Sequence, residues 1–288
     1  MHQKGLTALG LIARSIRATG LGAFLQVGRD VADFILVKSG RPPLKISLDG
    51  HVICGCFRHR SFLHNLSGGN YEAFTVELFK SHLRPGMTVV DGGAHIGFYT
   101  LLAAQLVGSS GKVYSFEPDP YSYQCLVFNI FQNNYWNINA IPKSVSNKQG
   151  NTVFYQSSGT ISSSIIDRDL PRSLFRGHSV KKILIQSTTL DLELETSSVD
   201  LVKLDIEGAE PLAIEGMSKI INNNRPLVLF TEINPSALYS SKTSPEVFIR
   251  SLKEFGFDIA FIDERRHELI PLTGKSSISK GNLYCKRD

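Results

Sequence analysis

The chain has 288 residues, of which 42% are hydrophobic and 20% charged, with a formal net charge of +5. This composition excludes an intrinsically disordered protein and suffices for one large globular domain with a small addition. The modest basic excess comes without a nucleic-acid-binding motif, so we expect no nucleic-acid partner. The four cysteines indicate reduced thiols. Cys54 and Cys56 lie in a strand-like run without a second CxxC pair, so we predict no metal site there.

Residues 1–39 show helical periodicity, with Leu9, Ile12 and Ile16 on one apolar stripe that a pair of glycines later interrupts. This pattern predicts a helical extension packed on the domain. The alternative is an amphipathic helix in peripheral contact with a membrane surface. No apolar run approaches the ~20 residues that cross a bilayer, and no signal-peptide pattern is present. We therefore predict no integral membrane segment and a cytoplasmic location.

A β-hairpin is predicted after this segment. Residues 44–48 alternate apolar and polar side chains, Asp49-Gly50 is a turn signal, and residues 51–54 form the return strand. We therefore divide the chain into an N-terminal helical segment and hairpin, residues 1–66, and a main domain, residues 67–288.

Downstream, strand patterns alternate with helical patterns. The predicted strands are 88–91, 112–117, 138–141, 151–156, 200–206 and 226–233, and the predicted helices are 71–83, 98–106, 121–132, 208–221 and one that begins at 244–246. This alternation predicts a doubly wound, mostly parallel α/β sheet. Two last strands, 257–262 and 283–286, have no helix between them and are expected to pair antiparallel. Residues 157–177 are predicted to form a loop that could act as a lid.

The first predicted strand leads through a glycine turn into a helix, and a helix N-terminus at a parallel sheet is an anion site. The pattern Asp91-x-Gly93-x-x-x-Gly97 is neither the GxGxxG of dinucleotide binders nor a P-loop. The Asp91 carboxylate would repel a pyrophosphate and attract an ammonium group. S-adenosylmethionine carries an ammonium, a carboxylate and a ribose, so the turn predicts this cofactor.

Glu117 supports the same ligand. It ends the second predicted strand and is followed by Pro118. An acidic residue at this position of a nucleotide-binding α/β fold accepts hydrogen bonds from ribose hydroxyls. The alternative interpretation is a solvated strand-end carboxylate. Ser144, just beyond the third predicted strand, is also expected to bind the cofactor.

Three blocks of the sequence, residues 90–100, 116–120 and 202–210, resemble the signature blocks of FkbM-type methyltransferases. The resemblance implies a class I, Rossmann-like fold with a seven-stranded sheet, S-adenosylmethionine as cofactor, and O-methylation of hydroxyls on sugars or secondary metabolites. Two positions depart from the family pattern: His95 stands where Asn is usual, and Gly92 where Val or Ile is common. Since His and Asn both form hydrogen bonds in turns, we expect His95 to remain a cofactor-binding residue.

The catalytic residues are predicted at the ends of the fourth and fifth strands. Asp205 and Glu207 lie two residues apart and share one face if the strand continues through them. Glu232 ends the next strand and is expected beside them. We predict Asp205 as general base or hydroxyl orienter, and Glu207 as a group that binds acceptor hydroxyls or tunes Asp205. Lys203 is expected to point to the opposite face and to be structural.

Several alternatives remain open at this stage. The three carboxylates could hold Mg²⁺ or another hard cation, although we favour a metal-free site. Glu210 could complement a helix dipole or contact substrate. Tyr71 and Glu72 could line the cofactor pocket or only pack. The acceptor is expected to be a small molecule or a glycan. The competing functions are an NAD-dependent α/β enzyme and a non-catalytic nucleotide-binding module.

Overall fold

The computed structural model describes residues 42, 44–69, 71–157, 163–166, 180–195, 198–272 and 279–288. The helix expected within residues 1–39 lies outside these ranges. So does most of the loop expected at 157–177.

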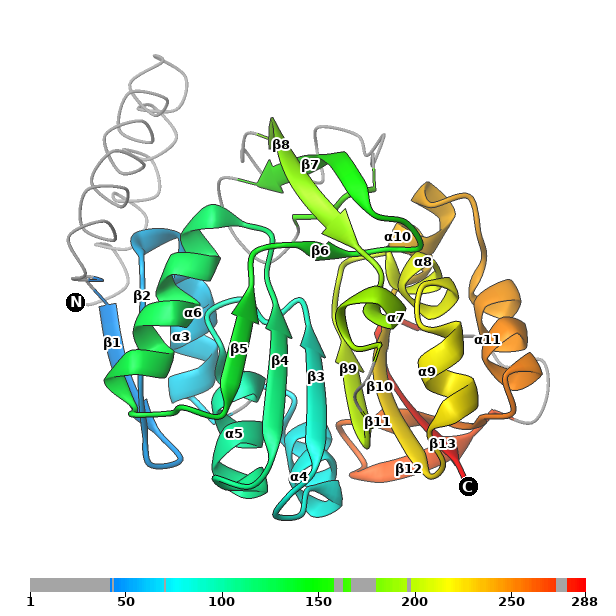
Figure 1. Ribbon diagram of the computed structural model, residues 1–288, viewed down its shortest axis with the longest axis horizontal. Helices are drawn as coiled ribbons and strands as arrows, with labels where there is room; N and C mark the ends of the chain where they lie inside the picture. The colour runs from blue at the N-terminus through cyan, green and yellow to red at the C-terminus, as the bar shows by residue number, and fades with distance from the viewer. Residues whose placement is uncertain are drawn as a thin grey trace, which may run out of the picture.

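The core of the fold is an eight-stranded sheet with the order β12-β11-β13-β10-β9-β3-β4-β5 (Figure 1). Its strands are β3 (Thr88–Gly92), β4 (Lys112–Phe116), β5 (Ile138–Ile141), β9 (Leu201–Leu204), β10 (Leu227–Ile233), β11 (Asp258–Asp263), β12 (Glu268–Pro271) and β13 (Gly281–Arg287). The five strands from β10 to β5 are parallel, and β13 pairs antiparallel with both β10 and β11. The predicted fold class is thus confirmed, and the predicted antiparallel pair at the end of the sheet is present. β12, in the turn-rich segment, adds an eighth strand to the seven expected.

Helices cover both faces of this sheet (Figure 1). One face carries α3 (Arg60–Ser67), α4 (Ala73–His82), α5 (Phe98–Val107) and α6 (Pro120–Gln132), and the other carries α7 (Leu190–Glu193), α8 (Glu210–Glu215), α9 (Ser218–Asn223), α10 (Pro235–Ser240) and α11 (Pro245–Glu254). The neighbouring residues Val89 and Val90 show why a parallel strand reads as continuously apolar: each is fully buried, one in each core.

The helix predicted over 208–221 is two helices, α8 and α9. The break lies at Gly216, where a side chain would begin 2.1 Å from the carbonyl oxygen of Ser146. The close approach of these two backbones requires a glycine. Gly216 and Ser146 are far apart in the sequence, so helical periodicity alone does not reveal their contact. None of the helices in the described part of the chain is long and apolar enough to cross a membrane.

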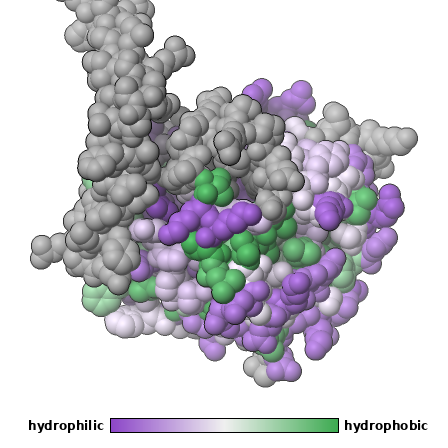
Figure 2. All heavy atoms as spheres, turned by 90° about the horizontal axis from the view of Figure 1, so that it is seen from above, coloured by the Kyte–Doolittle hydropathy of each residue, from purple (hydrophilic) through white to green (hydrophobic). Residues whose placement is uncertain are grey.

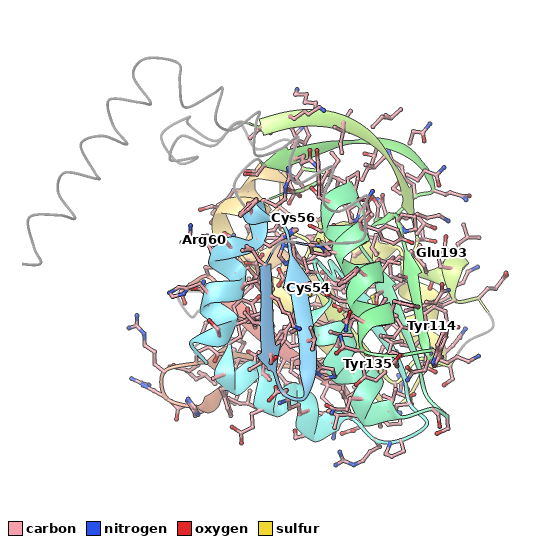
Figure 3. The ribbon with its side chains drawn as sticks, turned by 90° about the vertical axis from the view of Figure 1, so that its left-hand side faces the viewer. Cys54, Cys56, Arg60, Tyr114, Tyr135 and Glu193 are labelled. Atoms are coloured by element: carbon pink, nitrogen blue, oxygen red, sulfur yellow. The ribbon has the colours of Figure 1, made fainter. Side chains whose placement is uncertain are left out.

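The predicted hairpin is present as β1 (Leu44–Leu48) and β2 (His51–Gly55). It lies beside α6 (Figure 3). The side chains of Asn129 in α6 and of Asn133 just after it hold β2: Asn129 donates to and accepts from the backbone of Cys54, and Asn133 does the same with Val52, at 2.8–2.9 Å. These four bonds satisfy backbone groups at the edge of the hairpin and fix it to the main domain. The domain division at residues 66 and 67 stays a prediction.

A second, three-stranded sheet lies above the carboxyl ends of the parallel strands (Figure 1). It consists of β6 (Ser144–Val145), β7 (Gly150–Ser157) and β8 (Val180–Thr188) in the order β6-β8-β7. β7 matches the strand expected at 151–156. We did not predict β8, which begins with exposed residues including Lys181 and Lys182. The inner face of this sheet, which includes the buried Phe154, covers the carboxyl ends of the parallel strands, where ligands bind in such folds.

Candidate cofactor and acceptor site

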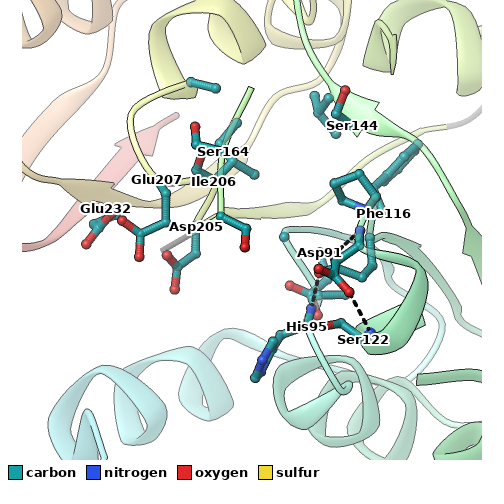
Figure 4. A pocket seen from close by; sticks show the side chains of 18 of the residues that line it. Asp91, His95, Phe116, Ser122, Ser144, Ser164, Asp205, Ile206, Glu207 and Glu232 are labelled. Carbon is teal, nitrogen blue, oxygen red and sulfur yellow. Dashed lines mark hydrogen bonds between the residues drawn. The ribbon is translucent and has the colours of Figure 1, made fainter. Parts of the chain in front are cut away.

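A cavity of about 310 Å³ lies at the carboxyl ends of the parallel strands, a volume suited to a small-molecule ligand. Figure 2 looks onto this edge of the molecule, where hydrophobic surface adjoins strongly hydrophilic side chains. Four acids at or just beyond the ends of β3, β4, β9 and β10 line the cavity: Asp91, Glu117, Asp205 and Glu232. Figure 4 shows Asp91 and His95 on one side and Asp205, Glu207 and Glu232 on the other. We call these the cofactor end and the acceptor end.

The turn between β3 and α5 depends on Gly93. Its φ is +85°, and a side chain there would begin 2.0 Å from the carbonyl oxygen of Asp205. The N–H groups of Gly93 and Ala94 both donate to the carbonyl of Phe116, at 2.9 and 3.0 Å. Gly97, with φ +95°, starts α5 and packs against Leu126. Gly93 lines the cavity. Gly97 is not among the residues found to line it, so its contribution is to the shape of the turn.

Asp91 is 2% exposed and lines the cavity as predicted. Its Oδ2 accepts a 2.6 Å hydrogen bond from the Thr100 hydroxyl on α5. Burial raises the pKa of Asp91, and the positive charge of Lys203 opposes that rise. The carboxylate is therefore fixed in place and can attract a cationic group of a ligand.

Glu117 holds the glycine turn to the end of β4. Its Oε2 accepts the backbone N–H of His95 and its Oε1 the N–H of Asp119, both at 2.7 Å. Burial, followed by the neighbouring Asp119, raises its pKa to about 8. Each oxygen of the carboxyl group can form a second hydrogen bond, so Glu117 can still bind a ligand hydroxyl. Pro118 and Ser144 also line the cavity.

His95 adopts a left-handed backbone conformation with φ +53°. Its ring packs edge-on against His59 and Phe62, with centroid distances of 4.8 and 4.6 Å. Burial lowers its pKa to about 4, so the ring is neutral at physiological pH. Its Nδ1 has no hydrogen-bond partner among the described residues. The sequence did not indicate the neighbours His59 and Phe62, because they come from the separate segment that follows the hairpin.

The three predicted catalytic acids converge at the acceptor end. One carboxylate oxygen from each of Asp205, Glu207 and Glu232 lies within 4.8 Å of the others. Glu207 has φ +55°, a conformation that is uncommon for residues other than glycine. Glu232 is only 6% exposed, and its burial together with the neighbouring acids raises its pKa to about 9.

The prediction for Lys203 was wrong. Its Nζ lies 3.1 Å from Oδ2 of Asp205 and 4.3 Å from the centre of the Tyr99 ring, inside the cavity. Residues 203 and 205 are two apart, so strand alternation places them on the same face. Burial works to raise the pKa of Asp205, but the charge of Lys203 and their hydrogen bond hold it below its usual value.

Two further residues complete the acceptor end. Lys280, which the sequence did not indicate, lies 2.9 Å from Oε1 of Glu232. Glu72 accepts the Tyr99 hydroxyl at 2.7 Å and the Asn282 amide at 3.0 Å, and it lines the cavity with Tyr71. Lys280 and Asn282 lie some 200 residues after Glu72, beyond the reach of any local pattern.

Glu210 lies in the first turn of α8, which fits the structural alternative and not the substrate contact. Its carboxylate accepts the backbone N–H groups of Ile206 at 3.0 Å and Gly208 at 2.8 Å. Burial raises its pKa to about 7. Glu210 thus fixes the loop that carries Asp205 and Glu207, and it is not among the residues found to line the cavity.

Comparison with solved structures gives distant likenesses. A putative rRNA methylase from Clostridium thermocellum is 13% identical, with 76% of this chain and 97% of that one covered and a TM-score of 0.46. A SAM-dependent O-methyltransferase from Thermotoga maritima is 11% identical, with 86% and 78% covered and a TM-score of 0.42. A SAM-dependent methyltransferase from Aquifex aeolicus is 16% identical, with 78% and 95% covered and a TM-score of 0.42. These likenesses are too distant to assign an activity, and no curated protein sequence matches the chain.

Comparison with protein families gives a closer assignment. The model of the methyltransferase FkbM domain matches residues 91–259, more than half of the chain. The matched region begins at Asp91 and contains Glu117, Asp205 and Glu232, so it includes acids from both ends of the cavity. The resemblance seen in the sequence is thereby confirmed, and the chain belongs to the FkbM methyltransferase family.

Proposed function

We propose that this methyltransferase uses S-adenosylmethionine to methylate a hydroxyl group of a sugar, a glycolipid or a secondary metabolite. The observation that carries the proposal is the division of one cavity between two kinds of site. The β3–α5 turn and Glu117 offer the groups that suit a nucleoside with an amino-acid tail. Across the cavity, three carboxylates offer the groups that suit a polar, hydroxylated acceptor.

At the cofactor end, Asp91 would pair with the ammonium group of the cofactor and Glu117 would accept its ribose hydroxyls. When bound, S-adenosylmethionine supplies the electrophilic methyl group. The chain contributes a rigid setting for it: Asp91 is held by Thr100, and both oxygens of Glu117 are held by backbone amides. Little side-chain freedom would then be lost when the cofactor binds.

At the acceptor end, Asp205 would take the proton of the acceptor hydroxyl as the methyl group is transferred. Lys203 holds its Oδ2 at 3.1 Å, and Asp205 lines the cavity. Glu207 and Glu232 would orient the acceptor through hydrogen bonds to its hydroxyls. Correct alignment matters most here, because methyl transfer is an in-line displacement.

The direct test is incubation of the protein with S-adenosylmethionine carrying an isotopically labelled methyl group. The acceptor panel contains free sugars, glycolipids and polyhydroxylated aromatic compounds, with RNA included as a further class. We expect label in an O-methyl group of one hydroxylated acceptor class. Label only in RNA or only on nitrogen would reject the proposed acceptor.

Two competing functions are tested by measuring cofactor binding together with methyl transfer. An NAD-dependent enzyme would bind NAD and not S-adenosylmethionine, and a non-catalytic module would bind cofactor without transferring the methyl group to any acceptor. Asp91 at the turn argues against NAD, since it would repel the pyrophosphate. A cytoplasmic location stays a prediction, and peripheral membrane contact stays an open alternative.

A further inference from the structure

The acceptor end has the spacing of a hard-cation site. One oxygen from each of Asp205, Glu207 and Glu232 lies within 4.8 Å of the other two. Oxygens that bind the same Mg²⁺ or Ca²⁺ ion at about 2.0–2.6 Å lie at most about 4–5 Å from one another. The three carboxylates can therefore reach one ion with small side-chain movements.

Glu232 provides a second and independent observation. Its side chain is only 8% exposed, and its Oε2 has no hydrogen-bond partner among the described residues. Leaving a buried carboxyl oxygen without a partner destabilises the folded protein, because the oxygen has lost its hydrogen bonds to water. Figure 4 shows the Glu232 and Glu207 carboxyl groups close together, so the unpartnered group belongs to the cluster itself. A ligand that binds there would remove this cost.

Two lysine side chains border the cluster, and only one of them is fixed in place. Lys203 is buried, and it is bound to Asp205, so it neutralises one of the three carboxylates permanently. Lys280 reaches Oε1 of Glu232 at 2.9 Å, but its side chain is 60% exposed and can turn into solvent.

From this arrangement we propose that Asp205, Glu207 and Glu232 bind one divalent hard cation, Mg²⁺ or Mn²⁺, and that the Lys280 ammonium group competes with this ion for Glu232. The ion would bind an oxygen of the acceptor and polarise it. That catalytic use rests on the proposed function, whereas binding of the ion itself does not.

The test is titration of Mn²⁺ alone into the full-length protein, followed by electron paramagnetic resonance of the free ion. We expect one saturable Mn²⁺ per chain, and at least tenfold weaker binding in Glu207→Gln and in Glu232→Gln. Glu254→Gln removes an exposed carboxylate on α11 and is the matched control, which should bind as the wild type does. Lys280→Ala removes the competing charge and should bind Mn²⁺ at least twofold more tightly.

Three results would overturn the inference: no saturable Mn²⁺ binding, equal binding by the wild type and both Gln variants, or weaker binding by Lys280→Ala. S-adenosylhomocysteine binding checks that each variant is folded, and if Glu232→Gln is not folded, Glu207→Gln decides alone.

The ion site and the proposed function can fail separately. Mn²⁺ binding without methyl transfer to any acceptor rejects the proposed function, and methyl transfer that EDTA does not affect, without Mn²⁺ binding, rejects only the ion.

Discussion

At the cofactor end of the cavity the carboxylates are bound by neighbouring N–H and O–H groups, whereas at the acceptor end they face one another. Glu117 accepts two backbone N–H groups and Asp91 accepts the Thr100 hydroxyl. Glu207 and Glu232 lie in a cluster of acids, and Glu232 keeps an unpartnered oxygen. The cofactor end is therefore complete before any ligand binds. The acceptor end keeps a buried carboxyl oxygen that a ligand can bind, which is the difference expected between a shared cofactor site and a site that selects its substrate.

The largest effect should come from the cofactor end, through Gly93→Ala. The new side chain would begin 2.0 Å from the Asp205 carbonyl oxygen at a φ of +85°. We expect a loss of about 3 kcal/mol in the free energy of unfolding and no measurable S-adenosylhomocysteine binding. Urea unfolding and calorimetry measure these two quantities.

Gly69→Ala is the matched control. Gly69 has a similar φ of +68°, but open space surrounds the position of a side chain. Only the left-handed backbone penalty of about 1–2 kcal/mol should then appear. Equal losses in the two variants would show that close approach to Asp205 is not what requires Gly93.

The next largest effect should appear at the acceptor end. Glu207→Gln and Glu232→Gln keep side-chain shape but replace the carboxyl group that orients the acceptor, so we expect kcat/KM to fall by about 10²-fold. The assay uses the acceptor that gives the highest rate in the panel above. S-adenosylhomocysteine affinity should stay within threefold of wild type. A parallel loss of affinity would mean that the two ends do not act as separate sites.

The sequence predicted those parts of the site that lie at strand ends. Asp91, Glu117, Asp205 and Glu232 end or directly follow strands that alternate with helices, and parallel strands bring their carboxyl ends together. Lys280 could not be found in this way, because it contacts Glu232 across a distance that no local pattern spans. Lys203 was different: the alternation rule, correctly applied, places it beside Asp205.

The fold was predictable to a similar degree and for the same reason. Central strands such as β3 and β10 contain adjacent apolar residues that are buried on both faces of the sheet, as is typical of strands covered by helices on both sides. β8 and β12 carry several exposed residues and owe their conformation to pairing with β7 and β11. Tertiary pairing of this kind overrides local preference, so single-sequence patterns do not reveal it.

A smaller effect is expected at the cofactor end, in the pH dependence of the unfolding free energy. The pKa of Glu117 is raised to about 8 by burial, so between pH 4.5 and 8 the folded protein binds a proton that the unfolded chain does not. Stability must therefore fall as pH rises through this range. Gln does not titrate, so the unfolding free energy of Glu117→Gln relative to wild type should increase by about 2 kcal/mol between pH 6 and 8. Urea unfolding of both proteins at the two pH values measures it, and a constant difference would contradict the buried state of Glu117.

The smallest effect is expected for His95→Asn. Asn tolerates the left-handed backbone conformation that His95 adopts, and the backbone N–H that binds Glu117 is retained. We expect S-adenosylhomocysteine affinity within threefold of wild type by calorimetry. A tenfold loss would instead show that the imidazole ring contacts the cofactor directly.

The most direct test of the two-ended cavity is one calorimetric series with S-adenosylhomocysteine and three proteins: wild type, Glu117→Gln and Glu232→Gln. Both variants replace a buried glutamate at a strand end by its neutral isostere, one at each end of the cavity. The account predicts one site per chain in the wild type, at least tenfold weaker binding in Glu117→Gln, and affinity within threefold of wild type in Glu232→Gln. Equal weakening in both variants, or no binding by the wild type, would contradict it.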